Sequence, residues 1–237
     1  MAKPFIKWVG GKSQLLEEIS EKYPLKIEKY CEPFVGGGAV LFDILSTKHP
    51  ESILINDINK ELINTYSQIK TNCDGMITQL SELQTIYKSH SLEENKAYFY
   101  EKRQRYNELK VNGNDAENLE KAALFIFLNK TCFNGLYRVN SKGLFNVPFN
   151  NAKNPLLCDE ENLRACSLLL QNVEMRDVNY KECKSFIDVL GVPAKAVGCS
   201  ALRSRSFLHF VSERLPPALQ VRQLRVQLFL GLFNRNN

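Results

Sequence analysis

The chain has 237 residues and a mass of 27.2 kDa, which is enough to bury a full core as one large domain or as a domain with an insertion. Hydrophobic residues make up 44% and charged residues 24% of the chain, as in an ordinary globular protein. No apolar run approaches the ~20 residues that span a bilayer, and MAKPFIKWVGGK has no signal-peptide core, so a cytoplasmic protein without membrane contact is expected.

The seven cysteines form no CxxC pair, and their spacing suits neither a zinc site nor a disulfide framework. We therefore expect reduced thiols and no metal site. The net charge of +5 is unevenly spread: residues 1–188 carry 24 basic against 25 acidic residues, whereas residues 189–237 carry seven basic residues and one acid. The positive balance belongs to the tail, so it says little about nucleic-acid binding by the rest of the chain.

Apolar spacing and turn residues predict an alternation of helices and strands along the chain. Helices are expected at 13–21, 38–47, 60–85, 91–111, 120–133 and 159–172, and strands at 28–32, 53–59 and 173–180. Residues 134–155 carry turn signals and a hairpin-like pattern. This order predicts an α/β sheet with helices on both faces and a mostly helical insertion at 60–155.

A glycine-rich turn, EPFVGGG, follows the strand at 28–32 and opens the next helix. Its contiguous glycines let the backbone approach a ligand at a helix N-terminus. Asp57 ends the next strand, about twenty residues on, where a carboxylate can accept hydrogen bonds from both hydroxyls of a ribose. This arrangement suits NAD as well as other nucleosides, although the GxGxxG pattern is not matched. For Asp57, a role in a strand-end turn or as a helix cap is an equal alternative.

The segment FIKWVGGK places Lys12 directly after two glycines, Gly10 and Gly11, in a tight turn that aims an ammonium at an anion. A carboxylate of an amino-acid-bearing ligand would suit it. The spacing excludes a Walker A loop. Trp8 is the only tryptophan, and its plain alternative is a core residue.

Four ordered segments, KPFIKWVGGK, CEPFVGGGAVLF, LINDINKELINTY and FLNKTCFNGLYRVNSKGLFNVPF, resemble the D12 class of adenine-specific DNA methyltransferases. This Dam-like family includes the GATC-modifying enzymes of restriction systems, and the resemblance covers residues 3 to about 187. It implies a Rossmann-like class I methyltransferase sheet and transfer of a methyl group from S-adenosyl-L-methionine to N6 of adenine in double-stranded DNA. It further implies a monomer that has a cognate restriction endonuclease as its functional partner.

The resemblance implies a cofactor-binding part at 1–59, a target-recognition insertion at 60–155 and a return to the methyltransferase domain at 156–188, before an atypical tail at 189–237. Trp8 and Lys12 would contact the methionine end of the cofactor, and Asp57 would hold its ribose. The full set of expected cofactor contacts is Trp8, Gly10, Gly11, Lys12, Glu32, Phe34, Gly36, Gly38, Asp57 and Asp177. Asp177 enters as a substitute, because Asn179 stands before Tyr180 where an adenine-holding acid is expected.

The segment NKTCFNGLYRVNSKGLFNVPF resembles the family's target-reading hairpin. Arg138 can donate two hydrogen bonds to guanine O6 and N7, Asn134 can pair with a base edge or phosphate, and Phe133 can wedge into the base stack. The alternative is a surface hairpin with Phe133 and Leu136 packed inward. Asn150, Asn151 and Ala152 then depart from the Gly, basic residue and Tyr that the family tends to show.

The family's Asp-Pro-Pro-Tyr turn, which orients the flipped adenine, is expected soon after YKECKSFID and is absent. The pair Pro216-Pro217, flanked by Leu215 and Ala218, offers neither acceptor side chain nor aromatic face. We therefore assign no catalytic residue, and we predict an incomplete sheet and an inactive chain.

The loss falls where composition changes: residues 189–237 hold one lysine and six arginines, whereas residues 1–188 hold 19 lysines and five arginines. A frameshift, fusion or recombination junction near 186–191 explains the change, and a genuine C-terminal element of unusual composition is the alternative. Three other interpretations stay open: a non-catalytic DNA- or cofactor-binding remnant, a nicotinamide-dependent enzyme, which KWVGGK disfavours, and a substitute turn within the tail.

Overall fold

The structure is a computed structural model that describes residues 2–180, 182 and 183. The expectations for residues 189–237, including the composition change and the Pro216-Pro217 pair, lie outside the described residues.

Three parallel strands form the sheet in the described part of the chain, in the order β1-β2-β3. They are β1 (Lys29–Glu32), β2 (Ser52–Asn56) and β3 (Val173–Arg176). Tyr30 lies opposite Ile53, and Ile53 lies opposite Val173, so all three strands end at one edge. The α/β prediction is confirmed, although β3 is shorter than the expected 173–180.

The helices follow the predicted order. They are α1 (Leu16–Ser20), α2 (Ala39–Thr47), α3 (Lys60–Thr71), α4 (Cys73–Ser89), α5 (Leu92–Asn112), α6 (Asn118–Thr131) and α7 (Glu160–Leu170), with 3-10 turns η1 (Ser13–Leu15), η2 (Asp115–Glu117) and η3 (Phe133–Gly135). The prediction of one helix at 60–85 is wrong, because Asn72 leaves helical geometry at φ −141° and ψ 50°. Apolar spacing runs through this break, since both α3 and α4 bury one side.

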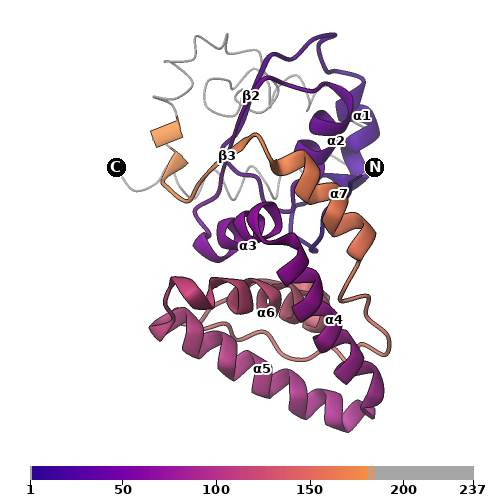
Figure 1. The fold of residues 1–237 in the computed structure, drawn as a ribbon, viewed down its shortest axis with the longest axis vertical. Coiled ribbons are helices and arrows are strands. Elements are labelled where there is room, and N and C mark those ends of the chain that lie inside the picture. The colour runs from indigo at the N-terminus through magenta and orange to yellow at the C-terminus, as the bar shows by residue number, and fades with distance from the viewer. Residues whose placement is uncertain (1, 181, 184–237) are drawn as a thin grey trace, which may run out of the picture.

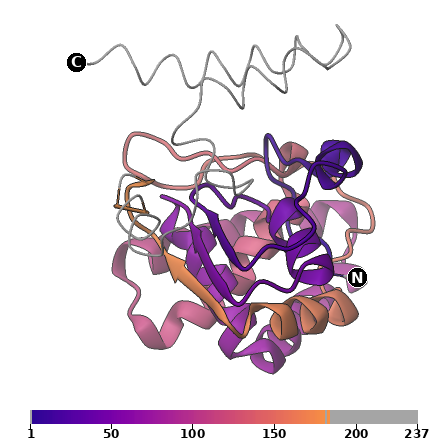
Figure 2. The ribbon, with the colours of Figure 1, turned by 90° about the horizontal axis from the view of Figure 1, so that it is seen from above.

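The helices form two layers joined by α3, as Figure 1 shows. The strand residues Tyr30, Ile55 and Val173 share one hydrophobic core with α2, α3 and α7, and α3 also packs closely on α6. Seen from above, β2 and β3 run side by side (Figure 2). Cys31 and Leu54 are buried on the opposite face and stand outside this core, so helices on both faces stay a prediction.

Residues 132–158, which include most of the stretch expected to read DNA and which we call the recognition segment after that expectation, run from the end of α6 towards α7. It is not built as a hairpin of regular strands: its described pairings are two isolated antiparallel bridges, Cys132 with Phe149 and Val139 with Phe145. The hairpin-like pattern is therefore only partly realised. Side chains from neighbouring helices hold the backbone of this segment in place.

Candidate functional site

Asp57 stands at the carboxyl end of β2 with both carboxylate oxygens engaged by backbone. Oδ2 accepts from the Gly36 amide at 3.1 Å, and Oδ1 accepts from the Asn59 amide at 3.0 Å. Partial burial raises the pKa of Asp57, and the two amides oppose that rise. The carboxylate is thus oriented while its remaining lone pairs stay free to accept hydroxyl hydrogens.

Asn56, which the sequence analysis did not single out, fastens three strand ends together. Its Nδ2 donates to the carbonyls of Pro33 and Val178, both at 3.1 Å, and its Oδ1 accepts from the Val178 amide at 3.0 Å. The side chain is only 1% exposed. One signal was readable: an amide closes the otherwise apolar run ILIN, where a buried polar group needs partners.

The glycine turn lies against Trp8. Gly36 has φ +51°, and a Cβ there would stand 2.7 Å from Trp8 Cδ1. A Cβ on Gly37 would stand 3.2 Å from Trp8 Cβ, and the Tyr66 hydroxyl donates to the Gly36 carbonyl at 3.0 Å. Trp8 is therefore half-buried at the turn, and the glycines are required by close approach as well as by backbone angle.

Glu32 and Lys12 supply opposite charges at the same edge. The Gly11 amide donates to the Trp8 carbonyl at 3.0 Å, which closes the turn that carries Gly10 and the exposed Lys12. Glu32 is buried and accepts from the Tyr30 hydroxyl at 2.7 Å. Burial raises the pKa of Glu32 to about 7, against the opposing effects of Tyr30 and Lys12. Lys12 and the ionised form of Glu32, which predominates above about pH 7, match the two charges of an amino-acid head group.

Exposed apolar side chains lie in the loops to which Asp57 is hydrogen-bonded. Phe34 is 49% exposed and packs on Tyr180, with ring centroids 5.3 Å apart, and Ile58 is 68% exposed. The loop after β3 is held here too, since the Asp57 amide donates to the Arg176 carbonyl at 3.3 Å, and this places Asp177 at the same edge. Apolar surface beside an oriented carboxylate fits a nucleoside. The role of Asp177 stays a prediction.

We call residues 32–38, 56–59 and 176–180 the strand-end site. With Trp8 and Lys12 beside it, it brings together the expected nucleoside-contacting residues. Of those that the sequence analysis missed, Tyr66 and Ile58 carried no distinguishing signal, because a tyrosine in a helix and an isoleucine after a strand are both ordinary. In the described part of the chain, no helix is long and apolar enough to cross a membrane, and no His, Cys, Asp and Glu cluster has the form of a metal site.

The candidate DNA-contacting residues occupy the exposed end of the recognition segment. Phe133 is 51% exposed, and Asn134 adopts φ +55° within η3. Arg138 is exposed, with Nε donating to Asn146 Oδ1 at 2.8 Å and Nη2 donating to the Asn146 carbonyl at 3.3 Å. Phe133 is therefore not packed inward, whereas Leu136 is partly buried against the core. The two hydrogen bonds to Asn146 orient the Arg138 guanidinium.

Side-chain amides from three helices hold the backbone of this segment. Gln84 of α4 accepts from the Leu157 amide, and Asn107 of α5 both accepts from the Phe145 amide at 2.8 Å and donates to the Phe145 carbonyl at 3.1 Å. Asn129 of α6 donates to the Gly135 carbonyl at 2.8 Å. Gln84, Asn107 and Asn129 each lie in a helix and bond to buried backbone of another segment. The helical pattern of the sequence therefore does not reveal their role.

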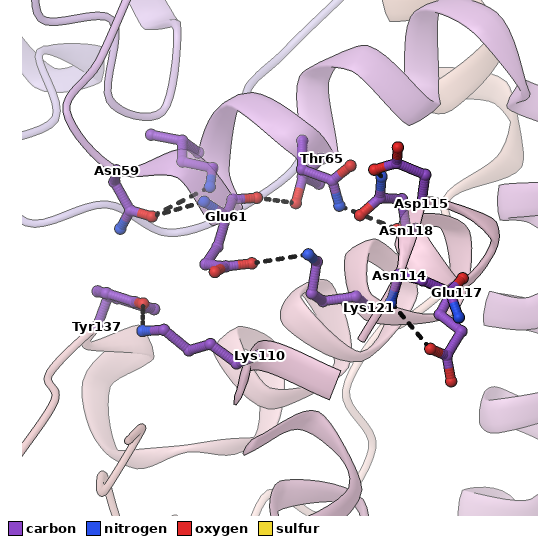
Figure 3. Close-up of polar contacts among 12 residues, drawn as sticks. Asn59, Glu61, Thr65, Lys110, Asn114, Asp115, Glu117, Asn118, Lys121 and Tyr137 are labelled. Atoms are coloured by element: carbon purple, nitrogen blue, oxygen red, sulfur yellow. Dashed lines mark hydrogen bonds and ion pairs between the residues drawn. The ribbon is translucent and has the colours of Figure 1, made fainter. Parts of the chain in front are cut away.

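Polar contacts also link the helices beneath the segment (Figure 3). Glu61 of α3 and Lys121 of α6 form an ion pair at 3.7 Å, and Asn59 caps α3 by accepting from two backbone amides. Lys110 of α5 donates to the Tyr137 hydroxyl at 2.8 Å. Tyr137, next to Arg138, is thereby held from α5.

The family model of D12 class N6 adenine-specific DNA methyltransferases matches residues 8–190. The chain is 44% identical over 191 residues to the type II methyltransferase M.MjaIII of Methanocaldococcus jannaschii, covering 78% of this chain and 65% of that protein. It is 41% identical over 170 residues to M1.LlaDCHI of Lactococcus lactis subsp. cremoris, covering 72% and 55%. It is 35% identical over 159 residues to a DNA adenine methylase of Escherichia coli K12, covering 67% and 51%. The chain thus spans about half to two thirds of the length of these relatives.

Proposed function

The chain belongs to the D12 class of N6 adenine-specific DNA methyltransferases, and from this premise we propose that it binds S-adenosylmethionine and double-stranded DNA with a GATC site. The acceptor in this proposal is N6 of adenine. The observation that carries it is the Asp57 carboxylate, oriented by the Gly36 and Asn59 amides beside an exposed apolar surface.

The residues of the strand-end site have distinct roles in the proposal. Asp57 accepts hydrogen bonds from the ribose hydroxyls, and Phe34 with Tyr180 offers apolar surface to the adenine. Lys12 faces the carboxylate and Glu32 the ammonium of the methionine end. The bound cofactor supplies an electrophilic methyl group on a sulfonium, and the protein's part is to hold it and exclude water.

The recognition segment supplies the DNA contacts. Arg138, oriented by Asn146, presents its guanidinium to guanine O6 and N7. Phe133, half exposed beside the turn at Asn134, fills the space that a displaced base leaves. Double-stranded DNA is therefore the proposed partner, and a restriction endonuclease of the same specificity is the proposed functional counterpart. The chain acts as a monomer in this proposal.

The absence of an Asp-Pro-Pro-Tyr turn from the sequence leads us to expect a low rate of methyl transfer. Adenine N6 needs hydrogen-bond acceptors and a stacking ring to aim its lone pair, and Pro216-Pro217 between Leu215 and Ala218 supplies neither. We therefore propose that this chain binds both ligands and transfers methyl groups slowly or not at all. A non-catalytic binding remnant is the second candidate, favoured by the same absence from the sequence.

The experiment measures binding and transfer separately with the full chain. Cofactor binding is followed by fluorescence of Trp8, the sole tryptophan, and transfer by labelled methyl incorporation into a GATC duplex against a GTAC duplex. Slow GATC-selective transfer, or binding of both ligands without transfer, supports the proposal, whereas binding of only one of the two ligands supports the remnant. Transfer at many turnovers per minute overturns the inactivity proposal, and loss of all binding overturns the function. Asp57→Ala is expected to weaken cofactor binding at least tenfold, which corresponds to a loss of ~1.4 kcal/mol of binding free energy.

A further inference from the structure

Asn129 uses its whole side-chain amide to join two turns that are distant in sequence. Its Oδ1 accepts from the Lys7 amide, and its Nδ2 donates to the carbonyls of Lys7 and Gly135, each at 2.8 Å. The residue is 4% exposed. One buried amide therefore ties the KWVGGK turn to the start of the recognition segment.

The two turns also touch directly. Gly135 has φ +63°, and a Cβ there would lie 2.6 Å from Lys7 Cβ. The backbone of the recognition segment thus meets the side of the KWVGGK turn with no room for a larger residue. Movement of one turn requires movement of the other.

A ring contact makes the second link. Trp8 stacks on Tyr137, with centroids 6.0 Å apart and planes 24° apart, while its Cδ1 and Nε1 atoms lie against Gly36 of the strand-end site. Tyr137 precedes Arg138 in the chain and is held by Lys110 (Figure 3). Trp8 therefore lies between the ligand-facing glycine turn and the residue next to the guanine-reading arginine.

We infer that Asn129 is a positioning residue that couples occupancy of the strand-end site to the grip of the recognition segment on DNA. The inference rests on the proposed function, since it requires both ligands to bind. A ligand that orders the KWVGGK turn orders Phe133 to Arg138 through Asn129 and Tyr137, so the second ligand meets a segment already in place. The coupling is reciprocal: each ligand tightens the other by the same factor.

Asn107 provides the matched control. It makes the same kind of contact, an amide donating to and accepting from the backbone of Phe145, and it anchors the same segment from α5. It makes no described hydrogen bond to residues 3–12. A purely structural role for Asn129 predicts equal behaviour of Asn129→Ala and Asn107→Ala, whereas coupling predicts a difference.

The experiment measures the dissociation constant of a labelled GATC duplex by anisotropy, with and without saturating S-adenosylhomocysteine, which cannot donate a methyl group. Trp8 fluorescence gives the reciprocal affinity of that ligand with and without DNA. We expect a ratio on the order of fivefold or more in the unaltered chain, as for typical coupled sites. Asn129→Ala should bring the ratio to about one, and Asn107→Ala should keep it even where DNA binding weakens.

Tyr137→Leu and Tyr137→Phe test the second link without altering Asn129. Leucine removes the ring that stacks on Trp8, so the ratio of the two DNA dissociation constants should fall. Phenylalanine keeps the ring and should preserve that ratio. This pair also tests the coupling if Asn129→Ala does not fold. Binding of both ligands with a ratio of one in the unaltered chain, or an equal change in the two asparagine variants, overturns the coupling alone. Failure of either ligand to bind overturns the proposed function and the coupling with it.

Discussion

The strand-end site and the recognition segment are fixed in different ways. At the strand ends, adjacent parallel strands set the positions, and Asn56 and Asp57 complete them with hydrogen bonds to neighbouring backbone. The recognition segment has two isolated bridges and is held by side-chain amides from helices. A site built on paired strands should unfold together with the sheet. A segment held by separate side-chain amides should instead lose its structure one contact at a time.

The largest effect is expected from Asn56→Ala. The substitution removes three hydrogen bonds and leaves the buried Pro33 carbonyl and the half-buried Val178 backbone without this partner, which should destabilise the protein by about 3 kcal/mol. The measurement is urea unfolding at constant m-value. Asn64→Ala, which loses one bond to the Asn118 carbonyl, is the control and should cost about 1 kcal/mol. Equal costs would mean that Asn56 does not fasten the strand ends.

A pH-dependent effect is expected from Glu32→Gln. Burial raises the pKa of Glu32 from 4.5 to about 7 in the folded protein, so the folded state keeps a proton that the unfolded state releases. Stability therefore falls as pH rises from about 4.5 to about 7 and is level above that. Glu32→Gln removes this penalty and should stabilise the protein by up to about 3 kcal/mol at pH 8, with little gain at pH 4. Unfolding free energies of both proteins at the two pH values test it, and a gain independent of pH would contradict it.

Gly36→Ala should act on the sheet side through Trp8. A methyl group at φ +51° and 2.7 Å from the indole must displace the ring, at a cost of about 1–3 kcal/mol together with a shift in Trp8 emission. Gly143→Ala in the recognition segment is the control, because φ is +74° there and nothing lies within 4 Å of the added carbon. The control should carry the backbone cost alone and leave the emission unchanged. An unchanged spectrum in Gly36→Ala would place Trp8 away from the turn.

The sequence predicts the strand-end site better than the recognition segment, for physical reasons. Apolar runs and glycine turns identify the strand ends, because burial and backbone conformation are local properties, and Asp57 and Gly36 follow from them. The amides of Gln84, Asn107 and Asn129 could not be found this way, since their partners lie far along the chain. The break at Asn72 was missed because both helices beside it bury one face with continuous apolar spacing.

The smallest stability change should come from Asn146→Ala, and it gives the sharpest test of the comparison. Asn146 is only partly buried, and its side chain holds Arg138 Nε, so its loss should cost at most about 0.5 kcal/mol in urea unfolding. The Arg138 guanidinium would then sample several orientations, and discrimination between GATC and a duplex altered at the guanine should fall about five- to tenfold, since a bidentate contact contributes ~1–3 kcal/mol. Asn140→Ala, which loosens the turn at Lys142 and Leu144 without touching Arg138, should leave that discrimination in place. If both variants lose discrimination and stability together, the recognition segment behaves as a single unit, as the strand-end site does, and the distinction between the two regions fails.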